Sequence, residues 1–154
     1  MTKDAVSIIC DEIAPQYYYD PRLILAMCEQ ESNYNEKAIR LENNFFRKYI
    51  QSNNQFNIAE ETSKILLSCS YGLTQVMGVL LYEKKYITSL ASQDVNDTLM
   101  EFLKDPKAQI KLCCIILHDK LKYCADQNNT EELLLKYNGG GNPNYGKEVL
   151  ARIA

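Results

Sequence analysis

Hydrophobic residues recur at helical spacing along most of the 154-residue chain, which predicts a mainly α-helical protein. Apolar side chains at positions i, i+3, i+4 and i+7 form one face of a helix and pack against a core. We expect a single globular domain of about eight helices that spans residues 1–154. The expected helices comprise residues 4–13, 21–32, 60–67, 73–82, a short segment within 87–103, and residues 105–123, 131–137 and 145–153.

Two of these helices begin with the same pair of residues, Asp20-Pro21 and Asp105-Pro106. An aspartate side chain accepts hydrogen bonds from the free amides of the first turn, while proline occupies the first helical position without losing a bond. The helix that follows Asp105 carries a broad apolar face. We therefore expect it to be the central, buried helix of the domain.

The helix that begins at Pro21 carries an acidic residue on its apolar face. Glu31 lies four residues after Met27 and three after Cys28, in line with core-facing side chains. Burial disfavours the charged form of a carboxyl, and so does the dipole at a helix C-terminus, which together predict a raised pKa for Glu31. Such a carboxyl can donate a proton near neutral pH. The alternative is a structural side chain that reaches solvent or pairs with an Arg or Lys.

Charge and hydropathy narrow the classes of partner. The 17 basic and 20 acidic residues give a net charge of −3, so the chain lacks the basic field typical of nucleic-acid binding, and we expect no nucleic acid as partner. No segment has the length of a transmembrane helix. The short apolar run at residues 5–10 is interrupted by Asp11, so no signal peptide is expected. These features predict a monomer that is made in the cytoplasm.

Cysteine and histidine give no sign of a metal or cofactor site. The cysteines show no C-x-x-C spacing and mostly lie within helical patterns, which predicts reduced, buried thiols. They are Cys10, Cys28, Cys69, Cys113, Cys114 and Cys124. His118 is the one histidine, and no Cys or Ser partner stands at an interpretable spacing from it. We expect neither a metal nor a cofactor.

Three separate blocks of sequence resemble the signature of one enzyme family. The first is Glu31-Ser32 with Asn35 and Ala38 downstream. The second, residues 70–77, is similar to an S-x-G-L-x-Q-x-M segment, and the third, residues 135–140, is similar to an A-Y-N-x-G segment. Their order and the intervening Asp105-Pro106 helix resemble the soluble lytic transglycosylases (SLT domain). These enzymes share the lysozyme-like fold with goose-type lysozymes, and the resemblance spans residues 21–152.

The resemblance implies a lysozyme-like fold with a substrate cleft and peptidoglycan as the partner. Glu31 would be the catalytic acid, Tyr137 would lie close to it, and Asn138 would help to form the cleft. Gln75 can both donate to and accept from an N-acetyl or hydroxyl group, whereas Met77 fits a sugar-lining role or a core role. The residues assigned to substrate binding are Ser32, Arg40, Glu42, Gly72, Gln75, Met77, Tyr137, Asn138 and Gly139.

Three of these residues have additional interpretations. Gly72 permits close backbone approach, and the glycines from Gly139 onward would let the backbone lie against a sugar. Arg40 either holds Glu42 or contacts an acidic peptide stem of the substrate, and the alternative is a surface ion pair of little energetic weight. The pattern A-x-R-x-E at residues 38–42, followed by aromatic residues, is similar to phage-type members of the family. Together with the missing signal peptide and the small size, it favours a virion-associated protein or an endolysin that acts on the cell wall or in the periplasm. The alternative is a bacterial protein exported by another route.

The reaction implied by the resemblance needs one carboxyl group. Glu31 would protonate the oxygen between N-acetylmuramic acid and N-acetylglucosamine, and the muramic 6-hydroxyl would then close a 1,6-anhydro ring. One alternative is a lysozyme-type hydrolase in which Glu42 or Asp94 positions a water molecule. Another is an inactive module that binds or assembles peptidoglycan. The aromatic run at residues 17–19 could stack on sugars, but packing against the core is the favoured interpretation.

Overall fold

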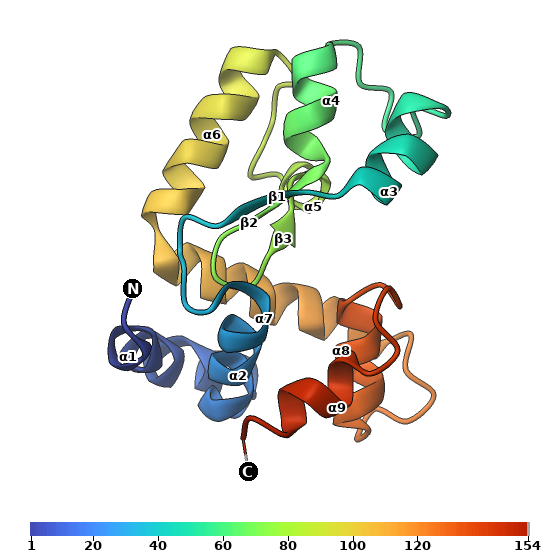
Figure 1. Cartoon of the computed structure of the whole chain (residues 1–154). Coiled ribbons are helices and arrows are strands. Elements are labelled where there is room, and N and C mark those ends of the chain that lie inside the picture. The colour runs from blue at the N-terminus through green and yellow to red at the C-terminus, as the bar shows by residue number, and fades with distance from the viewer. Residues whose placement is uncertain (154) are drawn as a thin grey trace.

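The computed structural model describes residues 1–153 and is mainly helical, as the hydrophobic pattern predicts. In chain order its helices are α1 (Lys3–Ile13), α2 (Pro21–Ser32), α3 (Asn43–Phe45), α4 (Glu61–Leu67), α5 (Gly78–Glu83), α6 (Ser92–Lys104), α7 (Pro106–Leu121), α8 (Thr130–Tyr137) and α9 (Tyr145–Leu150). A 3-10 helix, Ala14–Tyr17, follows α1, and a π-helix, Phe46–Gln51, follows α3. The fold class is that of a lysozyme-like helical domain (Figure 1).

Both predicted Asp-Pro helix starts are confirmed. Asp20 accepts a hydrogen bond from the amide of Arg22 at 2.9 Å, and Asp105 accepts one from Ala108 at 3.0 Å. These bonds satisfy amides that have no partner within the helix. Helix α8 begins in the same way, because Asn129 caps it by accepting from the amide of Glu132.

Helix α7 is the central element of the domain, as predicted. In Figure 1 it runs between a group formed by α1, α2, α8 and α9 and a second group that contains α4 and α6. Ile110 and Leu117 belong to the hydrophobic core of the first group, and Leu112 and Ile116 belong to that of the second. Because opposite faces of α7 are buried, the helix joins the two cores into one domain.

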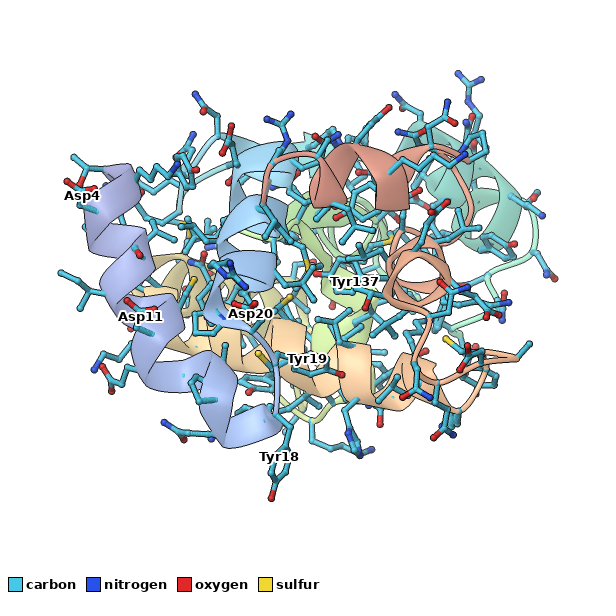
Figure 2. The ribbon with its side chains drawn as sticks, turned by 90° about the horizontal axis from the view of Figure 1, so that it is seen from below. Asp4, Asp11, Tyr18, Tyr19, Asp20 and Tyr137 are labelled. Atoms are coloured by element: carbon cyan, nitrogen blue, oxygen red, sulfur yellow. The ribbon has the colours of Figure 1, made fainter. Side chains whose placement is uncertain are left out.

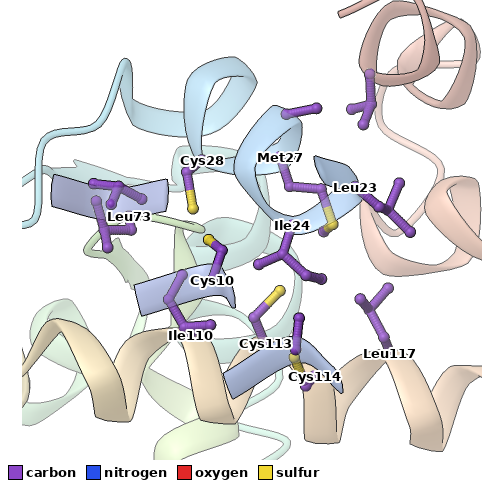
Figure 3. Packing of buried hydrophobic residues seen from close by; sticks show 14 of the residues in the cluster. Cys10, Leu23, Ile24, Met27, Cys28, Leu73, Ile110, Cys113, Cys114 and Leu117 are labelled. Atoms are coloured by element: carbon purple, nitrogen blue, oxygen red, sulfur yellow. The ribbon is translucent and has the colours of Figure 1, made fainter. Parts of the chain in front are cut away.

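The core of the first group contains most of the cysteines. Figure 3 shows Cys10, Cys28, Cys113 and Cys114 among Ile24, Met27 and Leu117, between α2 and α7. All six cysteines are free thiols, and five of them are buried, while Cys124 is half-buried. The prediction of buried core residues is confirmed for five of the six, and these small apolar groups pack as hydrophobic side chains do.

A small sheet between the two groups was not predicted. It has three antiparallel strands in the order β1-β2-β3: β1 (Ile39–Leu41), β2 (Cys69–Tyr71) and β3 (Val76–Met77). The expectation of a helix over residues 73–82 is wrong for its first half, because the helix begins only at Gly78. Gly72 and Gln75 have φ values of +76° and +49°, which a right-handed helix does not allow.

The largest remaining differences from the predicted helix boundaries are in α6 and α9. Helix α6 covers Ser92–Lys104 and is therefore longer than the short helix expected within residues 87–103. Helix α9 ends at Leu150, three residues before the predicted boundary. Helix ends are the least certain part of any assignment from periodicity, because the last turn lacks its intrahelical partners.

Candidate functional site

Glu31 occupies the next-to-last position of α2, where the apolar face of this helix reaches its end. Ile24, Met27 and Cys28 on the same face are fully buried, whereas Glu31 is half-buried. The helix ends at Asn33, which adopts φ +50° and donates its amide to the carbonyl of Glu29 at 3.0 Å. The left-handed cap turns the chain away and fixes Glu31 in the final turn.

A tyrosine from the other end of the chain binds the Glu31 carboxyl. The hydroxyl of Tyr145 donates a hydrogen bond to Glu31 Oε1 at 2.7 Å. Tyr145 is the first residue of α9 and is 2% exposed. Burial, followed by the nearby charge of Glu31, raises the pKa of Tyr145, so its hydroxyl remains a donor. The sequence analysis missed this partner, because it treated Tyr145 only as the start of a packing helix.

The pKa of Glu31 is raised above its ordinary value, as predicted. Burial is the main cause, and the negative charge of Glu42 acts in the same direction. The hydrogen bond from Tyr145 and the positive charge of Arg40 lower the pKa but do not cancel the effect of burial. The result is a carboxyl group that keeps its proton to higher pH than a solvated glutamate does, which suits a proton donor.

Arg40 and Glu42 form an ion pair at the edge of the sheet. Arg40 Nε donates to Glu42 Oε1 at 2.7 Å, and Ser70 Oγ on the neighbouring strand approaches the same oxygen at 2.8 Å. The side chain of Arg40 is 59% exposed, so the contact fits both a residue that holds Glu42 and a surface ion pair of little energetic weight. Contact of Arg40 with a peptide stem stays a prediction. The charges of both residues shift the pKa of Glu31, which places the ion pair close to this acid.

The turn between β2 and β3 explains the glycine at position 72. A Cβ atom at Gly72 would lie 2.4 Å from Gln109 Oε1, so only glycine fits. Gln109 is fully buried in α7 and accepts a hydrogen bond from the amide of Leu73 at 2.8 Å. Another group does come close to the backbone at Gly72, as predicted. That group is the side chain of Gln109.

Gln75 lies in this turn and is 8% exposed. Its amide nitrogen donates to the carbonyls of Gly72 and Ala38 at 3.0 and 3.3 Å, and its oxygen lies 2.9 Å from Ser70 Oγ. Ser70 has one hydroxyl hydrogen, so it donates to either Gln75 or Glu42 at any moment. Both N–H groups of Gln75 are therefore bound within the protein. The predicted contact of Gln75 with substrate stays a prediction.

Two more predicted site residues hold the same turn. Ser32 Oγ, next to Glu31, donates to the carbonyl of Leu73 at 2.8 Å, and Tyr137 Oη donates to that of Thr74 at 2.9 Å. The three blocks recognised in the sequence therefore meet around the turn at residues 72–75. Glu31 contributes to the pKa shift of Tyr137, which places this tyrosine near the acid as well.

The remaining predicted site residues surround this arrangement more loosely. Asn138 ends α8 and accepts a hydrogen bond from the amide of Asn142 at 2.8 Å. Gly139 is exposed, has φ +72°, and has no other atom within 4 Å of the position that a Cβ would take. Met77 is half-buried against the core of the second group, in agreement with a core role.

Asp94 does not belong to this site. It lies in the first turn of α6, and its charge acts on Glu60, which precedes α4. In Figure 1 the start of α6 is at the end of the molecule remote from α2. The alternative in which Asp94 positions a water molecule beside Glu31 is therefore wrong.

The aromatic run at residues 17–19 is divided between the core and the surface. Tyr17 and Tyr19 pack against the core of the first group, in agreement with the favoured interpretation. Tyr18 is 97% exposed, and Figure 2 shows its ring pointing away from the ribbon. Tyr137, also labelled there, lies well inside the outline of the molecule.

Within residues 1–153, no helix combines the length and apolar character that a bilayer crossing requires. In that same range no cluster of three or more His, Cys, Asp or Glu side chains is arranged to hold a metal ion. The groups that the structure brings together here are the carboxyl of Glu31, the hydroxyl of Tyr145 and the ion pair of Arg40 with Glu42.

Comparison with known proteins identifies a family for this chain. A family model described as the transglycosylase SLT domain matches residues 9–149, a range that holds Glu31, Tyr137 and Tyr145. A search of curated proteins and a search of solved structures each returned no significant match. Since the family model covers most of the 154 residues, the chain belongs to the transglycosylase SLT domain family, whose members are lysozyme-like, peptidoglycan-cleaving proteins.

Proposed function

We propose that residues 1–154 form one catalytic domain that cleaves the β-1,4 bond between N-acetylmuramic acid and N-acetylglucosamine, with Glu31 as general acid and base. Glu31 donates its proton to the oxygen that leaves with N-acetylglucosamine. The resulting carboxylate accepts the proton of the muramic 6-hydroxyl as this oxygen bonds to C1, which closes a 1,6-anhydro ring without water. The observation that carries the proposal is the half-buried carboxyl of Glu31, with its raised pKa and its bond from Tyr145.

The surroundings of Glu31 suit such a two-step role. A general acid works best when its pKa lies near the working pH, and burial moves Glu31 in that direction. The hydrogen bond from Tyr145 remains available to the carboxylate after the proton has left. We assign the wall opposite Glu31 to the exposed backbone at Gly139 and its neighbours Tyr137 and Asn138. All of these groups come from one chain, so a monomer suffices.

A hydrolase is the second candidate, because a second carboxylate lies near the first. Glu42 is close enough for its charge to raise the pKa of Glu31. Its Oε1 is occupied by Arg40 and Ser70, which fixes the carboxylate in place. In a hydrolase, Glu42 would position a water molecule beside Glu31, and the muramic product would carry a reducing end.

Mass spectrometry of the fragments released from purified peptidoglycan separates the two candidates. The ring closure yields muramic ends that are one water molecule lighter than the reducing ends of a hydrolase. We expect anhydro ends from the wild type, and we expect Glu42→Gln to change the rate without changing the product. Reducing ends that disappear in Glu42→Gln would instead establish the hydrolase. Binding to peptidoglycan without any release of fragments would establish an inactive module.

The hydrogen bond from Tyr145 should be visible in the pH dependence of the rate. Tyr145→Phe removes a donor that stabilises the ionised form of Glu31, so the pKa of Glu31 should rise. Because the acid must be protonated, the rate falls as pH rises through this pKa, and the fall should move to higher pH in the variant. The measurement is the pH profile of kcat/KM. Tyr137→Phe is the matched control, since Tyr137 donates to a backbone carbonyl and its loss should leave the position of the fall unchanged.

A further inference from the structure

Helix α9 is bonded to helix α2 at two neighbouring positions. The first contact is the hydrogen bond from Tyr145 to Glu31 described above. The second lies three residues further along α9, where Gln30 Nε2 donates to Glu148 Oε2 at 2.8 Å. Residues three apart on a helix lie on the same side of it, so Tyr145 and Glu148 both face α2. The proposed catalytic acid and the residue before it are therefore both bonded to α9.

The same carboxylate oxygen of Glu148 also binds the segment that joins α8 to α9 (Figure 1). Asn142 Nδ2 donates to Glu148 Oε2 at 2.9 Å. The backbone amide of Asn142 donates to Asn138 Oδ1 at 2.8 Å, and its side-chain oxygen accepts from the amide of Asn144 at 2.9 Å. Residues 139–141 are three glycines that lie between Asn138 and Asn142. They form a loop whose two ends are joined by a hydrogen bond.

Side-chain packing does not hold these glycines in place. Gly139 and Gly140 are exposed, and no other atom lies within 4 Å of the position that a Cβ would take. Glycine has more backbone freedom than any other residue, so ordering three of them costs much conformational entropy. The amides of Gly139 and Gly140 bond to the last turn of α8, and the next fixed point is Asn142. The path of the glycines therefore depends on Asn142 and, through it, on Glu148.

The side chain of Gln30 is oriented from its other end by Arg152. Arg152 Nε donates to Gln30 Oε1 at 2.9 Å, and Arg152 Nη1 donates to Glu29 Oε1 at 2.8 Å. Because the oxygen of Gln30 accepts from Arg152, its amide nitrogen faces Glu148. One oxygen of Glu148 thus accepts a donor from α2 and a donor from the residue that ends the glycine segment. This carboxylate is a direct bridge between the two.

We propose that Glu148 is a positioning residue that fixes the glycine segment, residues 139–141, relative to the proposed acid on α2. This inference rests on the proposed function, in which the segment forms the wall of the cleft opposite Glu31. Glu148 acts through Asn142 on the wall and through Gln30 on α2. Without this carboxylate, the segment samples several positions, and binding of a sugar must first order it. The cost of ordering weakens substrate binding and leaves proton transfer unchanged.

Two substitutions of Glu148 test the bridge. Glu148→Ala removes the oxygen that accepts both bonds, whereas Glu148→Gln keeps a carbonyl oxygen with two lone pairs that can accept both. Lys147→Ala is the matched control, because it removes an exposed side chain from the same turn of α9. If Glu148→Ala does not fold, Asn142→Asp tests the same bond. This variant keeps the oxygen that accepts from Asn144 but replaces the donor to Glu148 by a second oxygen.

The expected result is a change in KM without a change in pH dependence. We expect Glu148→Ala to raise the KM for peptidoglycan about fivefold, the effect of one net hydrogen bond, because Glu148 is exposed. The kcat and the pH at which kcat/KM falls should stay those of the wild type, since Tyr145 still donates to Glu31. Glu148→Gln should restore KM. A wild-type KM in Glu148→Ala, or an equal defect in Glu148→Gln, would overturn the proposal.

Amide hydrogen exchange tests the bridge without substrate and so separates this inference from the proposed function. The amide of Asn142, which donates to Asn138, should exchange about fivefold faster in Glu148→Ala. Its exchange in Glu148→Gln and Lys147→Ala should match the wild type. Unchanged exchange in Glu148→Ala, in an enzyme that cleaves peptidoglycan, overturns the positioning role alone. If the wild type releases no fragments from peptidoglycan, the proposed function and the positioning role both fall.

Discussion

Glu31→Gln should lower the turnover of peptidoglycan by about 100-fold or more, because positioned proton transfer contributes that much to a rate. The substitution keeps the size of the side chain and can still accept the hydrogen bond from Tyr145, but it cannot donate a proton to the leaving oxygen. Release of soluble fragments per unit time is the measurement. Lysis at the wild-type rate by the folded variant would refute the assignment of Glu31.

The same variant should be at least as stable as the wild type near neutral pH. Because burial raises the pKa of Glu31 in the folded state, folding is favoured while Glu31 is protonated, and this contribution is lost as pH rises through the folded pKa. Glutamine removes the penalty of ionising a half-buried carboxyl. Any gain in melting temperature should therefore be largest near pH 7 and should disappear at pH values below the ordinary glutamate pKa.

Glu29→Gln is the matched control on the same helix. The hydroxyl of Tyr34 donates to Glu29 at 2.7 Å and holds the pKa of this carboxyl below its ordinary value. Its contribution to stability is therefore present above the ordinary pKa and is lost as pH falls through the folded pKa. Glu29→Gln should be less stable than the wild type at neutral pH and should retain its activity. Equal behaviour of the two variants would contradict the account of α2.

Gly72→Ala should destabilise the protein by about 3 kcal/mol, since it adds left-handed backbone strain to a clash. Gly72 has φ +76°, and a Cβ there would lie 2.4 Å from Gln109 Oε1. Moving Gln109 would break its bond to the amide of Leu73 and release the turn that Ser32 and Tyr137 hold. We expect a melting temperature roughly 6–12 °C lower together with reduced activity.

The control for Gly72→Ala is Gly141→Ala. The nearest neighbour of a Cβ at Gly141 is 3.8 Å away, which is ordinary van der Waals contact. Thermal unfolding of this variant should stay close to that of the wild type. If both variants unfold at the same temperature, the turn at residues 72–75 is not the tightly constrained element described above.

The parts of the fold that depend on local sequence were predictable. Asp20 and Asp105 cap their helices through contacts with residues two or three positions away, and such contacts can be read from spacing alone. The position of Glu31 at the end of an apolar face also follows from the 3.6-residue period. The raised pKa follows from that position, because burial disfavours the charged form of the carboxyl.

The parts that depend on distant contacts were not predictable from periodicity. Tyr145 is 114 residues away from Glu31, and nothing in the spacing of α9 indicates which residue its hydroxyl meets. Strands β1, β2 and β3 contain two or three residues each, too few to show an alternating pattern. Gln75 was placed on a helix because its neighbours are apolar, whereas a buried hydrogen-bond network holds it at a positive φ.

The central claim is that Glu31 is the group whose protonation controls cleavage, and its pKa can be measured directly. The carbon-13 shift of the Glu31 carboxyl, followed by NMR against pH in the free enzyme, gives this pKa. The account predicts a value above 4.5, the ordinary value of glutamate, that coincides with the pH at which kcat/KM falls on the alkaline side. A Glu31 pKa at or below the ordinary value, or one unrelated to the rate profile, would contradict it.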